Sequence, residues 1–590
     1  MPSVAMTLSA LRRFLQNDQL LLAFLSLAVG LAVGWGVVGF REGVLFFHAQ
    51  FFGADGERLY DYVQALPWWQ VLSVPTLGGL SVGLLVRFGM PEARPQGVAD
   101  VIEASALQGG HMSMTVGLRA AFISALSIGV GASVGREGPA VHLGAALGAG
   151  IAKRLHLTRA LSRTLLGCGV AAAVAASFNA PIAGALFAGE VVIGHYALKT
   201  FAPVVIASVT GTAVSRAFYG DFPAFALPPH AISSYLELPA FAVLGVLSGI
   251  VATALMMGIF RIQDLSPRLP GPSFFRPAYG GFAVGLIALA LPQIMGVGYG
   301  ATDDALLGQM GLWLLVAVLI GKIVATSLSL GLGFGGGIFS PSLMIGAMLG
   351  GAYGIIATAL APVVDTGIGG YTLVGMGAVA AATLGAPIST TLIIFEMTGD
   401  YELTLGVMLA VVMSTAITRQ MLGHNFFTLQ LERRGLDLKG GFETQLLRAR
   451  FVADIMTATP QTLETVLPGV NMAKLRVLLQ LSRTGKLFVV DETGKLVGTI
   501  TLADLSDSAF DPAMDALINA ADVARRNPPV LLGDDHLETA LKKMADSGES
   551  LIAVIDDREA RTFLGAVEER QVMAAYTRAL VRARNEERDA

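Results

Sequence analysis

The residues best suited to chemistry in this chain form a short glycine-rich segment, residues 134–147, with the sequence VGREGPAVHLGAAL. Arg136 and Glu137 stand there between apolar runs, and charged side chains in such a setting are costly unless they have a partner or a function. Gly135 and Gly138, with the proline that follows, favour a bare backbone leading into a helix start. A helix start offers free N–H groups and partial positive charge, so the segment predicts an anion site that the Glu137 carboxylate could itself occupy. A packed turn, in which the two charges neutralise each other or a neighbour, fits the segment equally well.

The composition places this segment in a membrane protein. Of the 590 residues 54% are hydrophobic and 14% charged, which predicts a polytopic protein in a lipid bilayer. The charges gather at one end, because 38 of the 84 charged residues lie in residues 451–590, so a soluble domain is expected there. The net charge of −4 argues against a nucleic-acid partner. Cys168, the single cysteine, allows no intrachain disulfide and no zinc site built from thiols.

The membrane part consists of apolar runs, several of them too short or too interrupted by Gly and Pro to be simple spans. Broken helices of this kind are tolerated only where they are buried in protein or line a cavity. Basic residues before the first run and after the last predict that both termini are cytoplasmic. These basic residues are Arg12, Arg13, Arg433, Arg434, Arg448 and Arg450. The runs cover residues 20–40, 68–88, 118–133, 140–152, 165–193, 201–218, 239–260, 279–295, 312–330, 342–360, 371–395 and 403–417.

The membrane part also repeats itself, at about residues 70–220 and 235–420. Two halves with broken helices at matching places are typical of a transport protein whose site lies between the repeats, near the bilayer midplane. The glutamates that recur in both halves are expected mainly to cap backbone or to pair internally. The copies align at Pro139 with Pro341, Gly144 with Gly346, Leu147 with Leu349, Pro181 with Pro387, and Glu190 with Glu396.

From residue 451 the pattern changes to short β-branched strands that alternate with charged helices. A strand pair at residues 487–491 and 498–501 recurs at residues 552–556 and 565–567, which predicts a tandem α/β pair.

Other motifs carry little weight. Residues 131–135 fit the G-x-S-x-G pattern of a hydrolase, but that nucleophile needs a preceding strand, and both flanks are apolar helix, so we predict no enzymatic activity. The G-x-G-x-x-G at residues 331–336 lacks a parallel-sheet context and indicates a helix-breaking loop. His142 and His195 have no second ligand at metal spacing, so no metal site is predicted.

A second glycine-rich segment, residues 335–341 with the sequence GGGIFSP, is the repeat partner of the segment 134–147. We therefore expect two helix starts to converge. The alternative is a close-packed helix crossing that needs small residues. The sequence GREGP at 135–139 and the sequence GIFSP at 337–341 match the two signature loops of the CLC chloride channel and transporter family. The resemblance spans roughly residues 20–435, and residues 451–590 resemble a CBS-domain pair.

The resemblance implies an all-α polytopic membrane domain with broken helices, followed by an α/β cytoplasmic CBS pair. The expected boundaries are a cytoplasmic segment at 1–19, the membrane domain at 20–435, a linker at 436–450, and CBS domains at about 451–510 and 520–580. It also implies a homodimer in the cell membrane, with a separate pathway for chloride or other small anions in each subunit and Glu137 as the gating glutamate. The anion-binding residues carried over are Gln96, Gly97, Arg136, Gly138, Ile338, Phe339 and Phe427, with Phe339 contributing a backbone N–H.

Three departures from the family pattern bear on mechanism. A further loop of the family, at residues 95–100 here, usually reads G-S-G-I-P-E or G-H-G-V-P-E, and this chain has Gln96 in place of the Ser or His. Phe427 takes the place of a tyrosine that donates to the central anion, and a phenyl ring cannot donate. Val191 stands where many exchangers of the family have an inner proton-transfer glutamate. We therefore expect a voltage- or pH-gated chloride channel, ahead of a proton-coupled exchanger. A CBS-regulated divalent cation transporter and a membrane-tethered nucleotide sensor without transport are the rival classes.

The tail allows an adenine nucleotide as the one expected cofactor. Thr501 and Asp504 keep the small hydroxyl and the aspartate that bind nucleotide in CBS domains, whereas the second copy has Glu568 and Gln571 there. At most one nucleotide site per subunit is expected, and a purely structural dimer contact fits equally well.

Overall fold

The computed structural model describes residues 18–194, 198–221, 225, 237–360, 367–436, 447, 450–457, 464–505, 513, 515–557 and 559–589. The chain divides into two compact units, residues 1–438 and 439–590, and each is described by itself. The expected N-terminal segment 1–19 and linker 436–450 lie mostly outside the described residues. Arg12, Arg13, His195 and Arg448 lie outside them altogether.

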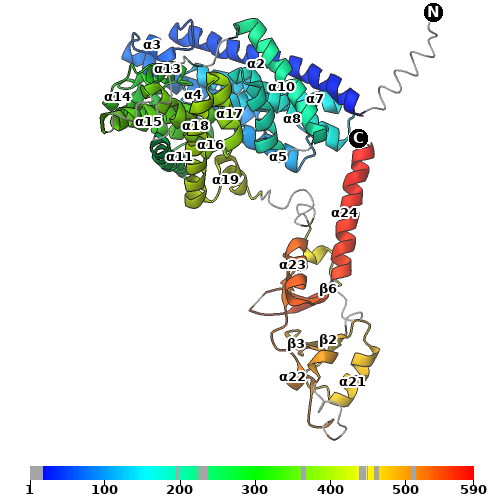
Figure 1. Ribbon diagram of the computed structural model, residues 1–590. Coiled ribbons are helices and arrows are strands. Elements are labelled where there is room, and N and C mark those ends of the chain that lie inside the picture. Colours follow the sequence, from blue (N-terminus) through cyan, green and yellow to red (C-terminus); the bar gives the residue numbers. More distant parts are fainter. Residues whose placement is uncertain are drawn as a thin grey trace, which may run out of the picture. The chain divides into compact units, whose positions relative to one another are not determined.

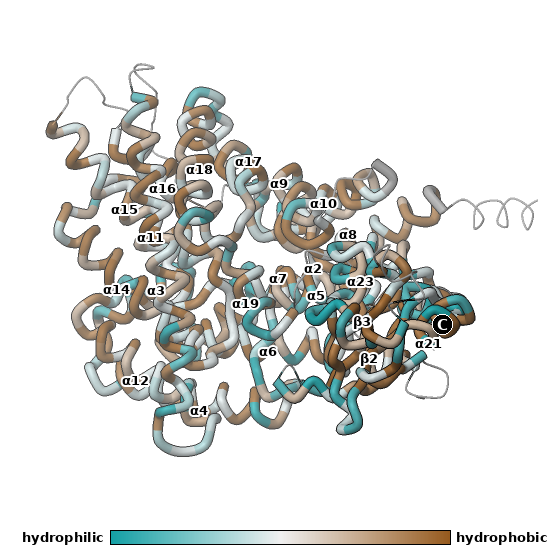
Figure 2. Tube along the Cα trace, turned by 90° about the horizontal axis from the view of Figure 1, so that it is seen from below, coloured by the Kyte–Doolittle hydropathy of each residue, from teal (hydrophilic) through white to brown (hydrophobic). Residues whose placement is uncertain are grey.

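The first unit is helical throughout its described part (Figure 1). Nine of the described helices are long and apolar enough to cross a membrane, so the chain is a multi-pass membrane protein. Figure 2 shows hydrophobic residues along much of the length of such helices, for example α14 and α15. The helices are α2 (Asp18–Phe52), α3 (Leu59–Val63), α4 (Trp68–Gly89), α5 (Val98–Ala106), α6 (Met114–Gly129), α7 (Glu137–Arg154), α8 (Arg159–Phe178), α9 (Pro181–Phe187), α10 (Leu198–Tyr219), α11 (Leu238–Leu265), α12 (Arg276–Ala288), α13 (Tyr299–Leu306), α14 (Leu312–Gly331), α15 (Phe339–Leu360), α16 (Gly367–Leu384), α17 (Pro387–Thr398), α18 (Tyr401–Leu422) and α19 (Phe426–Glu432).

Two of the apolar runs are each broken into two helices. The run 165–193 divides between α8 and α9, because Asn179 takes a left-handed conformation (φ 59°) and Pro181 starts the next helix. The run 371–395 divides between α16 and α17 in the same way, at Gly385 (φ 69°) and Pro387. The first run was expected to end at residue 40, but its helix continues to Phe52.

The two repeats use the same close helix crossing. A Cβ atom on Gly144 of α7 would lie 2.4 Å from the carbonyl oxygen of Gly169 on α8. A Cβ atom on Gly346 of α15 would lie 2.3 Å from the carbonyl oxygen of Gly375 on α16. Small residues let helix backbones approach this closely, so the paired glycines seen in the sequence mark equivalent crossings.

The second unit contains two modules of one design. In each, a three-stranded sheet has its first two strands parallel and its last two antiparallel. Phe488 and Leu496 of the first module are buried against Leu551 and Ile555 of the second, so the modules share an apolar core. The first module has β1 (Thr465–Val466), α21 (Met472–Leu481), β2 (Lys486–Val490), β3 (Leu496–Thr501) and α22 (Ala520–Val523), and the second has β4 (Val530–Leu532), α23 (Leu537–Ser547), β5 (Leu551–Ile555), β6 (Phe563–Glu568) and α24 (Glu569–Asp589).

Candidate functional site

The two glycine-rich loops meet through their backbones. The N–H of Gly135 donates to the carbonyl oxygen of Gly337 at 2.7 Å, and the N–H of Gly337 donates back to Gly135 at 2.8 Å. A Cβ atom on Gly138 would lie 2.9 Å from the Gly337 Cα, so the approach needs glycine on both sides. Because α7 begins at Glu137 and α15 at Phe339, two helix starts from different repeats converge here, as the repeat predicts.

The Glu137 carboxylate lies at this junction and is 1% exposed. The Tyr299 hydroxyl donates to Glu137 Oε1 at 2.7 Å, and the Ser340 hydroxyl donates to Oε2. Tyr299 begins α13 and Ser340 lies in the first turn of α15, so the second repeat supplies both donors to a carboxylate of the first.

The Arg136 side chain turns mainly to a different carboxylate. Its Nη1 lies 2.5 Å from Glu57 Oε1, and Arg41 Nε approaches the same oxygen at 2.6 Å. Arg136 Nε is 3.8 Å from Glu137 Oε1, and its guanidinium carbon lies 4.4 Å from the centre of the Tyr299 ring. A neighbour therefore neutralises most of this charge, as one of the sequence interpretations allowed.

A cavity of about 690 Å³ reaches Glu137. Five arginines line it, which makes its surroundings strongly basic, although Asp264 also belongs to its wall. The arginines are Arg87, Arg94, Arg276, Arg433 and Arg434. Six of the seven residues expected to bind the anion line the cavity, namely Gln96, Gly97, Gly138, Ile338, Phe339 and Phe427.

Arg136 is the exception among the expected anion-binding residues. It lines a separate, much smaller cavity of about 20 Å³, with Glu57, Tyr299 and His48. Its side chain lies there because Glu57 holds the guanidinium.

Gly97 lines the cavity, but its backbone N–H already has a partner. Its N–H donates to Asp100 Oδ2 at 2.7 Å, so the chain itself already satisfies this donor at the start of α5. Arg94 and Arg434 hold the same aspartate, with nitrogen to oxygen distances of 2.6 and 3.0 Å. A donor that is satisfied internally is poorly placed to bind an anion.

Aromatic rings surround Phe339 at the wall of the cavity. The Phe339 ring lies 4.9 Å from the Phe178 ring and 6.1 Å from the Phe187 ring, measured between centroids. Phe427 is 6% exposed and offers only carbon to the cavity. Side-chain hydrogen-bond donors close to Phe339 and Phe427 are therefore scarce. Gln96 is the polar side chain that the loop at residues 95–100 contributes to the cavity.

Four residues that contact Glu137 or support its neighbours received no role in the sequence interpretation: Tyr299, Ser340, Glu57 and Lys322. Lys322 is 0% exposed on α14, and its Nζ donates to the carbonyl oxygens of Ile294 (3.0 Å) and Gly296 (2.8 Å). These carbonyls belong to the turn that leads into Tyr299. The signal in the sequence was a single lysine inside the apolar run 312–330, since a charge there needs a partner.

The segment that follows α9 is a π-helix, Ala188–Ile193, and contains Glu190 and Val191. Glu190 accepts from the N–H groups of Ile388 (3.0 Å) and Ser389 (2.8 Å), so both of its oxygens cap α17. Glu190 thus acts as the scaffold carboxylate that the sequence predicts.

His142, left unassigned by the sequence, lies on α7 with 1% exposure. Neither of its ring nitrogens has a hydrogen-bond partner in the described part of the chain. Within that same part, no group of three His, Cys, Asp or Glu residues is placed to hold a metal ion.

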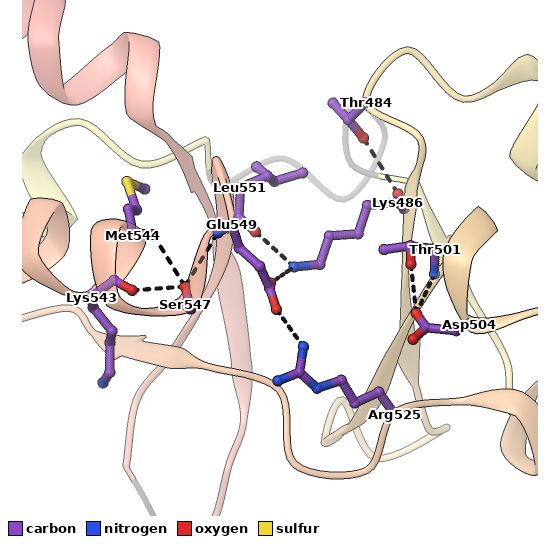
Figure 3. Close-up of polar contacts among 10 residues, drawn as sticks. All are labelled: Thr484, Lys486, Thr501, Asp504, Arg525, Lys543, Met544, Ser547, Glu549 and Leu551. Carbon is purple, nitrogen blue, oxygen red and sulfur yellow. Dashed lines mark hydrogen bonds and ion pairs between the residues drawn. The ribbon is translucent and has the colours of Figure 1, made fainter.

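The tail holds the predicted nucleotide residues at the end of β3 (Figure 3). Asp504 Oδ2 accepts from the Thr501 N–H at 2.8 Å and from its hydroxyl at 2.7 Å. Lys486 and Arg525 both bind Glu549, the second at 2.7 Å. In the second module Gln571 accepts from the Glu568 N–H and donates to the Thr457 hydroxyl, both at 2.8 Å.

Fold and site together define a multi-pass membrane protein in which two helix starts converge beside a basic cavity, and comparison with known proteins narrows this class. The family described as "Voltage gated chloride channel" matches residues 78–419, and the CBS domain matches residues 452–510 and 520–578. The chain belongs to the CLC chloride channel and transporter family and carries a C-terminal CBS-domain pair.

Relatives agree with this assignment. The putative chloride channel protein ClcB-like of Ralstonia nicotianae is 37% identical over 387 residues, which are 65% of this chain and 90% of that protein. The voltage-gated ClC-type chloride channel ClcB of Escherichia coli is 31% identical over 398 residues, 67% of this chain and 94% of the relative.

Two solved structures share the fold. A slow cyanobacterial Cl⁻/H⁺ antiporter superposes with a TM-score of 0.63 at 24% identity, covering 70% of this chain and 97% of its own. A eukaryotic CLC transporter superposes with a TM-score of 0.61 at 19% identity, covering 93% of this chain and 97% of its own. The fold class expected from the sequence is confirmed.

Proposed function

We propose that this protein carries chloride or other small anions passively across the membrane, through a pathway that Glu137 gates. The observation that carries the proposal is the position of Glu137. Its buried carboxylate lies where the two glycine loops join, and it lines the basic cavity. A negative group at converging helix starts occupies a place that suits an anion.

The gate works by competition. The ionised carboxylate holds the site against chloride, and protonation removes the competing charge, so that the side chain can leave and an anion can enter. Flux should therefore rise as the external pH falls. Membrane voltage would act on the same step, because a charge that moves through part of the membrane field gains or loses energy.

Anions rather than cations are the substrate class because the recurrent polar features are backbone N–H groups and arginines. A divalent cation transporter needs several hard oxygen ligands gathered at one place. The acidic residues at this site are instead spent on protein partners, Glu57 on Arg136 and Asp100 on Arg94.

Passive transport is favoured because the inner proton acceptor is missing. Val191 cannot titrate, and both oxygens of its neighbour Glu190 cap α17. The alternative is a proton-coupled exchanger, since the cyanobacterial protein with the same fold is a Cl⁻/H⁺ antiporter.

The protein's surroundings follow from the same proposal. We place it in the cell membrane as a homodimer, with both termini in the cytoplasm and with transport rather than catalysis as its activity. The CBS pair is proposed to bind an adenine nucleotide at Thr501 and Asp504. No nucleotide is proposed for the second module, because Glu568 and Gln571 stand there in place of the hydroxyl and the aspartate.

The test is anion flux from proteoliposomes, with proton movement recorded at the same time. Wild-type flux should rise on acidification, and a chloride gradient should drive no uphill proton movement. Glu137→Gln, which mimics the protonated form, and Glu137→Ala, which empties the site, should both conduct with little pH dependence. Glu402→Gln, at an exposed carboxylate in the first turn of α18, is the control and should behave as wild type.

Two results would contradict the proposal separately. Stoichiometric proton uptake during chloride efflux would replace the channel by an exchanger. A wild-type pH response in both Glu137 variants would make Glu137 a structural residue.

A further inference from the structure

We propose that Tyr299 and Ser340 form a latch, which holds the ionised Glu137 carboxylate in its closed position and so sets the pH at which flux begins. Both are positioning residues, since they act on the anion only through Glu137. The inference rests on the gating role proposed for Glu137. It adds two residues outside the signature motif of the first repeat.

The contacts are complementary. Tyr299 donates to Oε1 of Glu137 at 2.7 Å, and Ser340 donates to Oε2, so each carboxylate oxygen has its own hydroxyl donor. Glu137 and Ser340 are 1% exposed and Tyr299 is 5% exposed, so water competes little for these bonds. A hydroxyl that donates to a carboxylate stabilises its ionised form more than its protonated form. The latch therefore favours the closed, charged gate.

The Tyr299 ring is held in place before the gate moves. The guanidinium of Arg136 lies over one side of it at 4.4 Å, and the Phe225 ring lies 4.7 Å away, centroid to centroid. Lys322 fixes the preceding turn through the carbonyls of Ile294 and Gly296. A hydroxyl held this way loses little freedom when it binds the carboxylate, so its bond persists until Glu137 is protonated.

The charged groups near Glu137 come from the start of its own helix and from two further elements. Arg136, at the start of α7, lies 3.8 Å from Glu137, and Glu57 binds Arg136 from the loop before α3. Lys322 reaches from α14 towards Gly298, where an added Cβ would lie 3.4 Å from its Nζ. Tyr299→Phe and Ser340→Ala leave all these charges in place, so a change in pH response reports the lost hydroxyl.

The experiment measures chloride flux from proteoliposomes as a function of external pH, for the full-length protein. Tyr299→Phe and Ser340→Ala should each move the midpoint of activation to higher pH by about one unit, since a hydrogen bond to a charged group contributes about that much. Flux at neutral pH should rise accordingly, and the double variant should shift the midpoint further.

Matched controls exist in the same domain. Tyr353→Phe removes a tyrosine hydroxyl that donates to the Ala240 carbonyl at 2.9 Å, and Ser414→Ala removes a buried serine hydroxyl bound to the Ala378 carbonyl at 2.8 Å. Both remove a hydrogen bond from the helical unit without touching Glu137, so the midpoint should stay at the wild-type pH.

The outcomes separate the latch from the gate. A wild-type midpoint in either Tyr299→Phe or Ser340→Ala, while Glu137→Gln has lost its pH response, overturns the latch and leaves the gate standing. A wild-type pH response in Glu137→Gln overturns both. A midpoint that moves to lower pH also contradicts the latch. If one variant does not fold, the other decides the question alone.

Discussion

Glu190 and Glu396 occupy equivalent positions in the two repeats, and each caps the first turn of a helix that belongs to the other repeat. Glu396 accepts from the N–H groups of Ile182 (2.9 Å) and Ala183 (2.7 Å) at the start of α9. Glu190 accepts from the corresponding N–H groups of Ile388 and Ser389 at the start of α17. Each glutamate lies near the end of its own helical segment and caps the start of the other repeat's, so the two repeats are joined by a reciprocal pair of caps.

This reciprocity predicts a role in stability rather than in gating. Glu190→Ala or Glu396→Ala should lower the free energy of unfolding by about 0.5–2 kcal/mol, the usual cost of losing a helix cap. The midpoint of flux against pH should remain that of wild type. Thermal unfolding in detergent, followed by tryptophan fluorescence, measures the first effect and proteoliposome flux the second.

Glu402→Gln is the matched control for these caps, since Glu402 is an exposed glutamate in the first turn of α18. It should not lower the unfolding temperature. A glutamate variant of normal stability but altered pH response would show that the cap belongs to the transport mechanism.

The convergence of the two loops could be predicted from sequence because local residues encode it. Gly135 and Gly138 mark one close approach, Gly337 the other, and a proline follows each loop within its helix start. Aligning the repeats then brings the two starts to a common site. Of the six expected residues that line the cavity, Gly138, Ile338 and Phe339 belong to these two loops. The other three, Gln96, Gly97 and Phe427, were expected from the family resemblance alone.

The donors to Glu137 could not be predicted in this way. Tyr299 and Ser340 lie 162 and 203 positions from Glu137 along the chain, so only the tertiary fold shows that their hydroxyls meet its carboxylate. Asp100 is different, because its cap on Gly97 spans three residues and a local capping box would have revealed it. The family resemblance instead implied that Gly97 binds the anion.

Phe427→Tyr should strengthen central anion binding. Phe427 lines the cavity close to Phe426, and a hydroxyl there would add a donor to the anion. A hydrogen bond to a charged partner contributes about 1.5–3 kcal/mol, which corresponds to a roughly ten- to hundred-fold lower Kd for chloride. Isothermal titration calorimetry of the purified protein measures it.

The control adds the same hydroxyl outside the cavity. Phe122 is 54% exposed on α6, so Phe122→Tyr should leave the Kd for chloride unchanged. An unchanged Kd in Phe427→Tyr as well would mean that the ring does not face the bound anion.

Nucleotide binding to the tail should depend on Asp504. One of its oxygens is used by Thr501, and Oδ1 has no hydrogen bond to any residue that the structure describes, so it can accept from a ribose hydroxyl. Equilibrium dialysis of the full-length protein with ATP, ADP or AMP should find at most one nucleotide per subunit. Asp504→Asn should weaken binding about ten-fold or more, as expected for losing a hydrogen bond to a charged acceptor.

Asp491→Asn provides the comparison for this site. Asp491 Oδ1 accepts from the N–H groups of Thr493 and Lys495, each at 2.9 Å, and the Thr493 hydroxyl holds the pKa of this exposed carboxyl below its usual range. The variant changes the same kind of charge away from Thr501 and should bind nucleotide normally. Absence of binding by all three nucleotides in the wild type would end the proposal.

Glu57→Gln should shift the pH midpoint of flux in the direction opposite to that of Tyr299→Phe and Ser340→Ala. Glu57 holds Arg136 at 2.5 Å, while Glu137 lies 3.8 Å from the same side chain, so the two carboxylates share one guanidinium. Without the charge on Glu57, more of the positive charge acts on Glu137 and stabilises its ionised, closed form. The midpoint of flux against external pH should then move to lower pH. The shift should be only about half a unit, because Glu57 is partly exposed and solvent screens its charge.

The amide of Gln can still accept from Arg136 and Arg41, so the fold around the gate should survive. Asp61→Asn is the control, since it neutralises an exposed carboxylate that binds Arg58 at 2.7 Å in the same region, and its midpoint should match wild type. In Glu57→Gln combined with Glu137→Gln, flux should show no pH dependence, because the group that responds to Arg136 is gone. A midpoint that rises in Glu57→Gln would show that Arg136 does not act on the Glu137 carboxylate.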